Sequence, residues 1–256
     1  MIPAALIFDV DGTLAETEEL HRQAFNETFA AFGLPWFWDR ALYRKLLEVA
    51  GGKERLGHYL DAHDPPAAAA AAGRIAALHA AKTARYTALV EAGAAPLRTG
   101  VGRLIGEARR QGIALAIATT TSLANVEALL RATLGQDGLA AFATIGAGDM
   151  VAAKKPAPDV YGLVLERLAL PAGRCVAFED SAIGLAAARG AGVPTVVTPS
   201  VYTDDQPFPA ALAVVSHLGE PRDPYCHLAG AGAADGMVTL AALARWLDPP
   251  PDRVAP

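Results

Sequence analysis

The sequence predicts an α/β fold in which a mostly parallel sheet carries helices on both faces, with a smaller all-helical segment inserted after the first strand. Three observations support this. The apolar run Ala4–Phe8 does not alternate, which is typical of a strand buried on both faces. After residue 97, such runs alternate with helical patterns, which favours βαβ units and a parallel sheet. Between these parts, residues 15–93 carry helical patterns and no strand pattern.

The segment that follows the first strand is predicted to be helical throughout. Apolar residues recur at helical spacing in four stretches, which are 15–32, 40–49, 54–62 and 78–90. Gly33 and Pro35 end the first of them. An insertion at the carboxyl end of a sheet strand is where an active-site lid belongs. We therefore expect two domains: a discontinuous core of residues 1–15 and 95–256, and a helical cap of residues 16–94.

The remainder of the chain alternates between strand and helix patterns. Strands are expected at the five apolar runs 113–118, 144–147, 175–178, 195–198 and 213–215. Helices are expected over 101–111, 125–134, 159–168 and 183–190, and a final helix over 237–247. The tail after Tyr202 is rich in Pro, Gly and Ala, so 213–215 is expected to be the last strand. Residues from Pro249 onward are expected to be loose, and we assign no role to the alanine-rich stretch 67–72.

The composition excludes several classes of function. Of the 256 residues, 52% are hydrophobic, which is enough for a real core. A net charge of −5 at pH 7 offers no basic stripe for nucleic acid. No apolar run is long enough to span a membrane, and the N-terminus reads as a strand rather than a signal peptide. Cys175 and Cys226 lie far apart, which indicates a reducing compartment without a disulfide or zinc framework. No long heptad pattern is present, so we expect a monomer.

Two carboxylates stand at the end of the first strand. Asp9 and Asp11 follow the apolar run directly, and Gly12 allows a sharp turn after them. The carboxyl ends of strands in open α/β sheets border the ligand crevice. Two acids in such a place need a cation between them, and hard oxygen ligands at an open site favour Mg²⁺. The alternative is an Asx turn that caps the next helix.

Polar groups also follow the later strands. Thr119 and Thr120 stand between a strand and a helix, where hydroxyl and backbone N–H groups can cradle a phosphate. Four hydroxylated residues in a row are also typical of an ordinary loop. Asn125 either faces a substrate or caps the helix. Lys154 and Lys155 precede a rigid Pro-x-Pro turn, which can fix an ammonium beside a transferring phosphate, although two lysines in a loop usually lie at the surface.

A second acidic pair, Glu179-Asp180, ends the strand expected at 175–178. Together with Asp9 and the Asp11 carbonyl, this pair can complete an oxygen-rich magnesium site. Asp180 is the stronger candidate, and Glu179 binds the metal either directly or through water. The alternative interpretation of one acidic pair is a helix cap.

These motifs, in this order and each at a strand end, resemble those of the haloacid dehalogenase (HAD) superfamily of phosphotransferases. The first of them reads Asp9-Val10-Asp11-Gly12-Thr13. The resemblance implies a Rossmann-like core with a helical cap. It also implies that Asp9 is the nucleophile that forms an aspartyl-phosphate and that Asp11 is the general acid/base.

The resemblance assigns roles to the other motifs as well. Thr119 and Thr120 would bind phosphate. The lysine directly before the proline, Lys155, would screen the charge between the phosphoryl group and the nucleophile, with Lys154 as a solvated neighbour. The implied cofactor is Mg²⁺, and its implied ligands are Asp9, Asp11 through its carbonyl, Glu179 and Asp180.

The first helix of the inserted segment offers two candidates for substrate binding. Glu18 and His21 lie one turn apart and face the same way. His21 could form a hydrogen bond near Asp11 and tune its protonation. The alternative for both residues is a half-exposed helix face.

Cations gather elsewhere in the inserted segment. Tyr43 and Arg44 precede a flexible loop, Gly51-Gly52-Lys53-Glu54-Arg55, and Lys82 shares a helix face with His79 and Arg85. A segment this rich in cations in an acidic protein indicates a bisphosphate substrate, with one phosphate hydrolysed in the core and the other held by the cap. A solvated helix surface is the alternative. The substrate-binding candidates are Glu18, His21, Tyr43, Gly51, Gly52, Lys53, Lys82, Thr120 and Asn125.

Longer stretches resemble the CbbY family of Calvin-cycle operons and their plastid relatives. These stretches are 15–22, 25–27, 36–38, 51–55, 118–122 and 146–150. The resemblance implies a phosphatase for xylulose 1,5-bisphosphate, an inhibitor of Rubisco, and therefore a functional link to Rubisco. It implies either the bacterial cytoplasm or a plastid stroma with a transit peptide removed.

The core motifs determine the chemistry and leave the substrate open. A β-phosphoglucomutase-like phosphomutase or a phosphoglycolate-type phosphatase would share every core residue, because the lifetime of the aspartyl-phosphate depends on cap closure and water access. A more remote alternative is a non-catalytic Rubisco-associated binding protein. The intact set Asp9, Asp11, Lys155 and Asp180 argues against that alternative.

Overall fold

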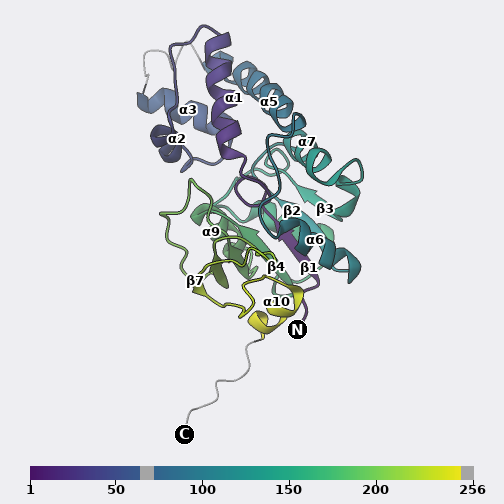
Figure 1. Ribbon diagram of the computed structural model, residues 1–256. Coiled ribbons are helices and arrows are strands. Elements are labelled where there is room, and N and C mark those ends of the chain that lie inside the picture. Colours follow the sequence, from purple (N-terminus) through teal and green to yellow (C-terminus); the bar gives the residue numbers. More distant parts are fainter. Residues whose placement is uncertain (64–71, 249–256) are drawn as a thin grey trace.

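The computed structural model describes residues 1–63 and 72–248 (Figure 1). It contains a seven-stranded sheet in the order β3-β2-β1-β4-β5-β6-β7. All neighbouring strands in it are parallel except β6 and β7. This confirms the predicted mostly parallel sheet. The strands are β1 Ala5–Phe8, β2 Ala114–Ala118, β3 Thr144–Gly146, β4 Cys175–Glu179, β5 Thr195–Val197, β6 Ala213–Val215 and β7 His227–Gly230.

Strand β7 shows that the expectation of 213–215 as the last strand was wrong. It pairs antiparallel with β6 at the edge of the sheet, and all four of its residues are exposed. Backbone hydrogen bonds to one neighbour are enough to hold such a strand. Its side chains do not have to be buried, so no apolar run marks it in the sequence.

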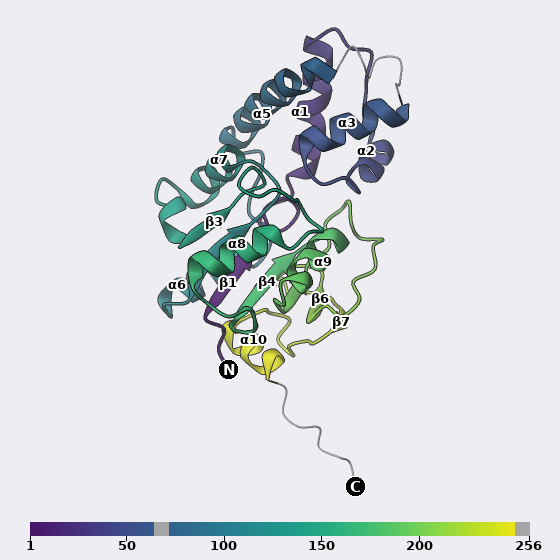
Figure 2. The same cartoon turned by 180° about the vertical axis from the view of Figure 1, so that it is seen from behind.

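Helices cover both faces of the sheet, as the two opposite views show (Figures 1 and 2). In β1, Leu6 and Phe8 pack with residues of α6, α7 and α10, whereas Ala5 and Ile7 pack with residues of α8 and α9. Successive side chains of a strand point to opposite faces, so one apolar run serves both layers. These helices are α6 Val101–Arg110, α7 Leu123–Leu134, α8 Asp159–Leu168, α9 Ala182–Gly190 and α10 Leu240–Leu247, with short 3₁₀ turns at Leu139–Ala141 and Ala172–Arg174.

The described helices between β1 and residue 94 lie together beyond one end of the sheet, at the top of Figure 1. They enclose their own apolar cluster, in which Trp36 and Trp38 pack against Phe29. The two connections to the sheet run side by side, because Ala15 and Leu97 form a β-bridge. The helices are α1 Glu18–Ala31, α2 Arg40–Leu46, α3 Gly52–His63 and α5 Ile75–Glu91, with a 3₁₀ turn at Ala72–Arg74.

Several helix ends differ from the expected ones. Helix α1 begins at Glu18 rather than at residue 15, α2 ends at Leu46 rather than at 49, and α3 already begins at Gly52. Helix α10 begins at Leu240 rather than at 237, because the Thr239 side chain accepts a hydrogen bond from Ala242 N and caps it.

Two sequence expectations fall largely outside the described residues. Residues 67–71 of the alanine-rich stretch and the tail from Pro249 onward are not covered by the described ranges. Within those ranges, no helix combines the length and the apolar character needed to cross a membrane. Both cysteines are free; Cys175 is buried in the core and Cys226 is exposed.

Candidate active site

Three strand ends supply the centre of the site. Asp9 follows β1, Thr119 follows β2 and Glu179 is the last residue of β4. Since β2 and β4 both pair with β1 in parallel, these ends meet at one edge of the sheet. Gly12, in the turn after β1, has a φ of 79°, and a Cβ there would lie 2.3 Å from Asp180 Oδ2. The turn therefore needs glycine both for its conformation and for its space.

The ammonium of Lys155 lies between two carboxylates. Its Nζ is 2.7 Å from Asp9 Oδ1, 2.7 Å from Glu179 Oε1 and 2.9 Å from Ala118 O. All three charged side chains are buried. Burial by itself lowers the pKa of Lys155, but the two carboxylates outweigh it and raise that pKa above its ordinary value. Lys155 is thus a buried, protonated partner of Asp9, and the surface alternative is wrong for it.

Three carboxylates converge beside this ammonium. One oxygen each of Asp9, Glu179 and Asp180 lies within 4.8 Å of the others. Burial raises the pKa of Asp9 well above its ordinary value and that of Asp180 to about 7, and neighbouring carboxylates add to both shifts. Glu179 Oε2 is buried without a hydrogen-bond partner. A hard divalent cation would neutralise this charge and give that oxygen a partner, so the residues fit Mg²⁺.

The carboxylate of Asp11 is held apart from these three. Its Oδ1 accepts a hydrogen bond from Thr17 Oγ1 at 2.5 Å and lies 2.9 Å from His21 Nε2. Burial would raise the pKa of Asp11, but His21 and Thr17 lower it to about 2. Its side chain is therefore placed to exchange a proton with His21 rather than to join the carboxylate cluster.

His21 connects Asp11 to a buried lysine. His21 Nδ1 lies 2.5 Å from Lys82 Nζ, and the His21 ring stacks on Tyr86 with ring centroids 3.9 Å apart. Burial lowers the pKa of Lys82 to about 7. The half-exposed and solvated-surface alternatives are therefore wrong for His21 and Lys82. They hold for Arg85, which is partly exposed and pairs with Glu27.

Two cavities adjoin these groups and share the lining residues Arg55 and Thr120. The smaller has a volume of about 290 Å³, and its charged centre consists of Asp9, Asp11, Lys155, Glu179 and Asp180. The larger has a volume of about 790 Å³, and its basic side chains are His21, Lys53, Arg55, His79, Lys82 and Lys154.

The predicted substrate-binding residues divide between the two cavities. The larger is lined by His21, Gly51, Gly52, Lys53, Lys82, Thr120 and Asn125, and the smaller by Glu18 and Thr120. Tyr43 lines neither, because it is fully buried and donates its hydroxyl to Glu18 Oε2 at 2.8 Å. Thr119 also lines neither; its hydroxyl accepts a hydrogen bond from Thr121 N at 3.2 Å and orders the loop from behind.

Asn125 does not cap α7. Ser122 occupies the N-cap position, and Asn125 lies inside the first turn of the helix. Its Nδ2 donates to Thr121 Oγ1 at 2.9 Å, while its buried Oδ1 has no partner. Of the two alternatives, the cap is therefore wrong, and the side chain faces the larger cavity.

Some contacts of the site were not predicted. Lys154 is partly exposed, as expected of a solvated neighbour, but its Nζ also lies 2.8 Å from Glu54 of α3. Ser200 and Thr203, in the loop after β5, form hydrogen bonds with Asp180. The signal for Ser200 is its position shortly after the parallel strand β5, comparable to that of the polar residues after β1, β2 and β4. The sequence offers no comparable signal for Thr203, whose position depends on the path of the loop.

Comparison with known proteins agrees with this geometry. A family model described as haloacid dehalogenase-like hydrolase matches residues 3–192. The chain belongs to this hydrolase family. Within it, the chain is 55% identical over 245 residues to the plasmid-encoded CbbY protein of Cupriavidus necator. The alignment covers 94% of this chain and 96% of the relative.

Two solved structures of CbbY from Rhodobacter sphaeroides share the fold of this HAD hydrolase. The complex with phosphate is 52% identical, has a TM-score of 0.78, and covers 84% of this chain and 94% of that chain. A mutant in complex with xylulose-(1,5)bisphosphate is 51% identical, has a TM-score of 0.79, and covers 86% of this chain and 96% of that chain. These relatives make the chain a phosphatase of the HAD family and support action on sugar phosphates.

Proposed function

We propose that this HAD hydrolase converts xylulose 1,5-bisphosphate to xylulose 5-phosphate and phosphate. The observation that carries the proposal is the pair of cavities, one with carboxylates around Lys155 and the other rich in basic side chains. A bisphosphate suits this pair, because one phosphate can react beside Asp9 while the other is held near Lys53. The R. sphaeroides CbbY complex with xylulose bisphosphate supports this choice of sugar.

In the proposed first step, a carboxylate oxygen of Asp9 attacks phosphorus, the bond from phosphorus to the sugar oxygen breaks, and an aspartyl-phosphate forms. Lys155, 2.7 Å from Asp9 Oδ1, screens the charge between the carboxylate and the phosphoryl group. Thr120, which lines both cavities, donates a hydrogen bond to the phosphoryl oxygens. Asp9, Glu179 and Asp180 would hold Mg²⁺, which when bound supplies positive charge to carboxylates and phosphate alike.

Asp11 handles the proton in both proposed steps. The leaving sugar oxygen needs a proton, and Asp11 can obtain it from His21 Nε2, 2.9 Å away, while Lys82 restores it at His21 Nδ1. In the second step Asp11 takes a proton from the water that attacks phosphorus, and Asp9 is released with phosphate. A pKa of about 2 keeps Asp11 ionised between turnovers, which is the form that a base requires.

The start of α3 is the proposed site for the second phosphate. Gly51 and Gly52 bring the backbone close to the larger cavity, and a Cβ on Gly52 would lie 2.9 Å from the His79 ring. Unpaired N–H groups and the helix dipole favour an anion at this end of a helix. Lys53 adds a full positive charge in the first turn.

We also propose that residues 16–94 act as a cap domain over a core of residues 1–15 and 95–256. The separate apolar cluster of the inserted helices and their place beyond the strand ends support this division. The functional link to Rubisco, the monomeric state and the compartment, bacterial cytoplasm or plastid stroma, stay predictions.

A phosphate-release assay tests the proposal. The chain is incubated with and without Mg²⁺ against xylulose 1,5-bisphosphate, xylulose 5-phosphate, glucose 1-phosphate and phosphoglycolate. We expect magnesium-dependent release with kcat/KM for the bisphosphate several orders above that for the monophosphates. Glucose 6-phosphate formed without free phosphate would favour the mutase, and a preference for phosphoglycolate would favour that phosphatase type. Turnover of no ester would favour the non-catalytic binding protein.

A further inference from the structure

A tyrosine from the sheet domain is built into the apolar cluster of the inserted helices. Tyr202, in the loop after β5, is buried and packs at 5.6 Å between ring centroids against Tyr43 of α2. Its hydroxyl donates to Glu19 of α1. All other buried members of this cluster come from residues 25–78. The place of the Tyr202 side chain therefore depends directly on where the inserted helices lie.

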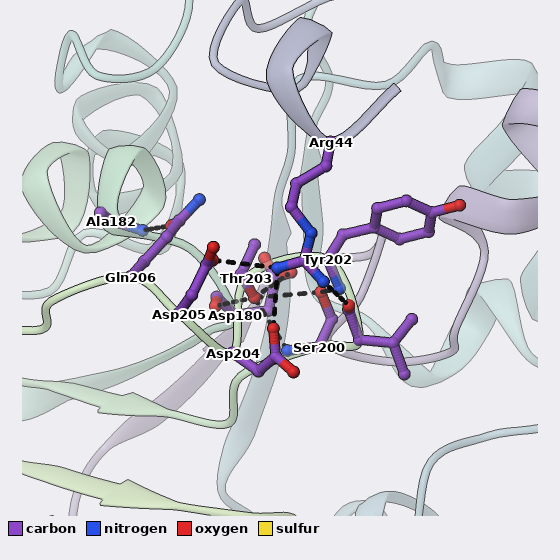
Figure 3. A network of polar contacts seen from close by, with 10 residues as sticks. Arg44, Asp180, Ala182, Ser200, Tyr202, Thr203, Asp204, Asp205 and Gln206 are labelled. Atoms are coloured by element: carbon purple, nitrogen blue, oxygen red, sulfur yellow. Dashed lines mark hydrogen bonds and ion pairs between the residues drawn. The ribbon is translucent and has the colours of Figure 1, made fainter. Parts of the chain in front are cut away.

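The residues on both sides of Tyr202 hold the carboxylate Asp180. Thr203 Oγ1 lies 2.7 Å from Asp180 O and 3.4 Å from Asp180 Oδ2, and the Ser200 side chain also bonds the Asp180 side chain. Ser200 and Thr203 are buried and bond one another at 3.0 Å (Figure 3). Because Tyr202 lies between Ser200 and Thr203 in the chain, a shift of its backbone would be passed on to these two hydroxyl groups.

Arg44 of α2 binds the same loop through its partly exposed side chain. Its guanidinium lies 2.8 Å from Asp204 Oδ1, 2.9 Å from Asp205 Oδ1 and 2.6 Å from Val201 O. Figure 3 shows these bonds beside the Asp180 contacts. The same guanidinium lies 5.9 Å from the centre of the Tyr202 ring. One cap side chain thus fixes the loop on both sides of the residue that enters the cap.

We propose that Arg44 and Tyr202 are positioning residues that couple the placement of the cap to Asp180 and thereby to the affinity for Mg²⁺. This inference rests on the proposed magnesium site. Neither residue belongs to the carboxylate cluster, so any effect on metal binding has to pass through the loop 200–206. The coupling is reciprocal: metal binding at Asp180 favours the docked cap by the same factor as the docked cap favours the metal.

The test is a metal titration of the full chain without substrate. Mn²⁺ binding, followed by electron paramagnetic resonance, gives the affinity for Mn²⁺. Competition by Mg²⁺ then gives the affinity for Mg²⁺. We expect Arg44→Ala to weaken binding about 3- to 20-fold. Arg44→Lys, which keeps the charge and loses the planar fork, should fall between wild type and Arg44→Ala. Tyr202→Phe, which keeps the ring and loses the bond to Glu19, should have a smaller effect.

Arg40→Ala is the matched control. Arg40 lies on the same helix and pairs with Glu19 at 3.4 Å, but no bond joins it to the loop 200–206 among the interactions described. It should leave the metal affinity unchanged. Thermal unfolding without metal verifies that each variant is folded; Arg44 is partly exposed, so its replacement leaves no buried cavity.

A double-mutant cycle isolates the route. Thr203→Val removes the hydroxyl that holds Asp180 and should by itself lower the affinity for the metal ion. If the loop carries the coupling, Arg44→Ala should add little in the Thr203→Val background. Folded Arg44→Ala with wild-type affinity, or fully multiplicative effects in the cycle, would overturn the coupling. Absence of metal binding by the wild type and by Asp180→Asn alike would instead overturn the magnesium site, and the coupling with it.

Discussion

The two sides of the cleft carry opposite charges and are built in different ways. At the strand ends, Asp9 and Glu179 are buried, and the buried Lys155 ammonium lies 2.7 Å from an oxygen of each of them. The larger cavity is instead lined by basic side chains of the inserted helices, such as Lys53 at the start of α3 and Lys82 of α5. The first arrangement fixes a reacting centre within a rigid sheet. The second presents positive charge to a ligand of less defined shape.

This difference teaches that chemistry and selectivity are separable in this molecule. Removing a charge at the strand ends leaves its neighbours buried without compensation. Removing one from the larger cavity should cost only the contact it makes with an anion. Variants of the two sides should therefore fail differently: the first in turnover, with a loss of stability where the buried cation is removed, and the second in binding.

The largest effect is expected from Asp9→Asn. The amide keeps the shape but cannot attack phosphorus, so kcat should fall by at least about 10⁴-fold. Replacing a buried carboxylate of raised pKa by a neutral group should not unfold the chain. Phosphate release measures the first result and thermal unfolding the second. A rate within tenfold of wild type would remove Asp9 from its proposed role and leave the strand ends without their nucleophile.

Lys155→Met should affect both turnover and stability. We expect kcat to fall roughly 10²- to 10³-fold and the free energy of unfolding without metal to drop by about 3 kcal/mol, because Asp9 and Glu179 remain buried beside each other. Urea unfolding measures the second quantity. The neighbouring Lys154→Met is the control for stability: its ion pair with Glu54 is partly exposed, so its loss should cost less than about 1 kcal/mol. Equal losses in the free energy of unfolding for Lys155→Met and Lys154→Met would contradict the expected difference between the buried and the partly exposed lysine.

The strand-end side of the cleft was largely predictable from the sequence, and the reason is geometric. A residue that directly follows a buried parallel strand has its place fixed by the register of that strand. Asp9 and Glu179 therefore came together as expected once the strands were recognised, whereas Thr119, which follows β2, lines neither cavity and uses its hydroxyl within its own loop. Strand β7 was missed because its exposed residues carry no burial signal.

The helical side was predicted less well, because a helix pattern does not tell where the helix docks. Tyr43 was expected to meet substrate and instead lies buried behind Glu18. Lys82 was expected to bind substrate, with a solvated surface as the alternative; it lines the larger cavity, and its contact with His21 was not predicted. Tyr202, far away in the sequence, completes the apolar cluster of the inserted helices. Such long-range packing leaves no local periodicity to read.

Lys53→Ala should separate binding from chemistry. A charged hydrogen bond to phosphate contributes about 1.5–3 kcal/mol, so KM for the bisphosphate should rise roughly 10- to 100-fold. The kcat for a small monophosphate such as p-nitrophenyl phosphate, which cannot reach α3, should change less than about twofold. Lys45→Ala, an exposed lysine on α2, is the control and should change neither quantity. A fall of kcat for both substrates would contradict this separation, because Lys53 would then contribute to the chemical step.

The smallest effect concerns the acid that links α1 to the loop after β5. Glu19 accepts hydrogen bonds from Arg22 and Tyr202, and these, with burial opposing them, lower the pKa of Glu19 to about 2. The ordinary pKa of a glutamate side chain is 4.5. Because the folded pKa is depressed, the stabilisation is complete above the unfolded pKa and is lost as the pH falls toward the folded one.

Glu19→Gln should therefore lower the free energy of unfolding at pH 7 by about 1 kcal/mol or less, since the pair is partly exposed. The difference from wild type should stay constant between pH 7 and about pH 5, and narrow below that. Urea unfolding at a series of pH values measures it, and Glu27→Gln on the same helix, whose ion pair with Arg85 is longer at 3.6 Å, is the comparison. A difference that persists unchanged to pH 3 would mean that Glu19 acts through packing. The link between Glu19 and the loop after β5 would then depend on the packing of the Tyr202 ring rather than on the charge of the acid.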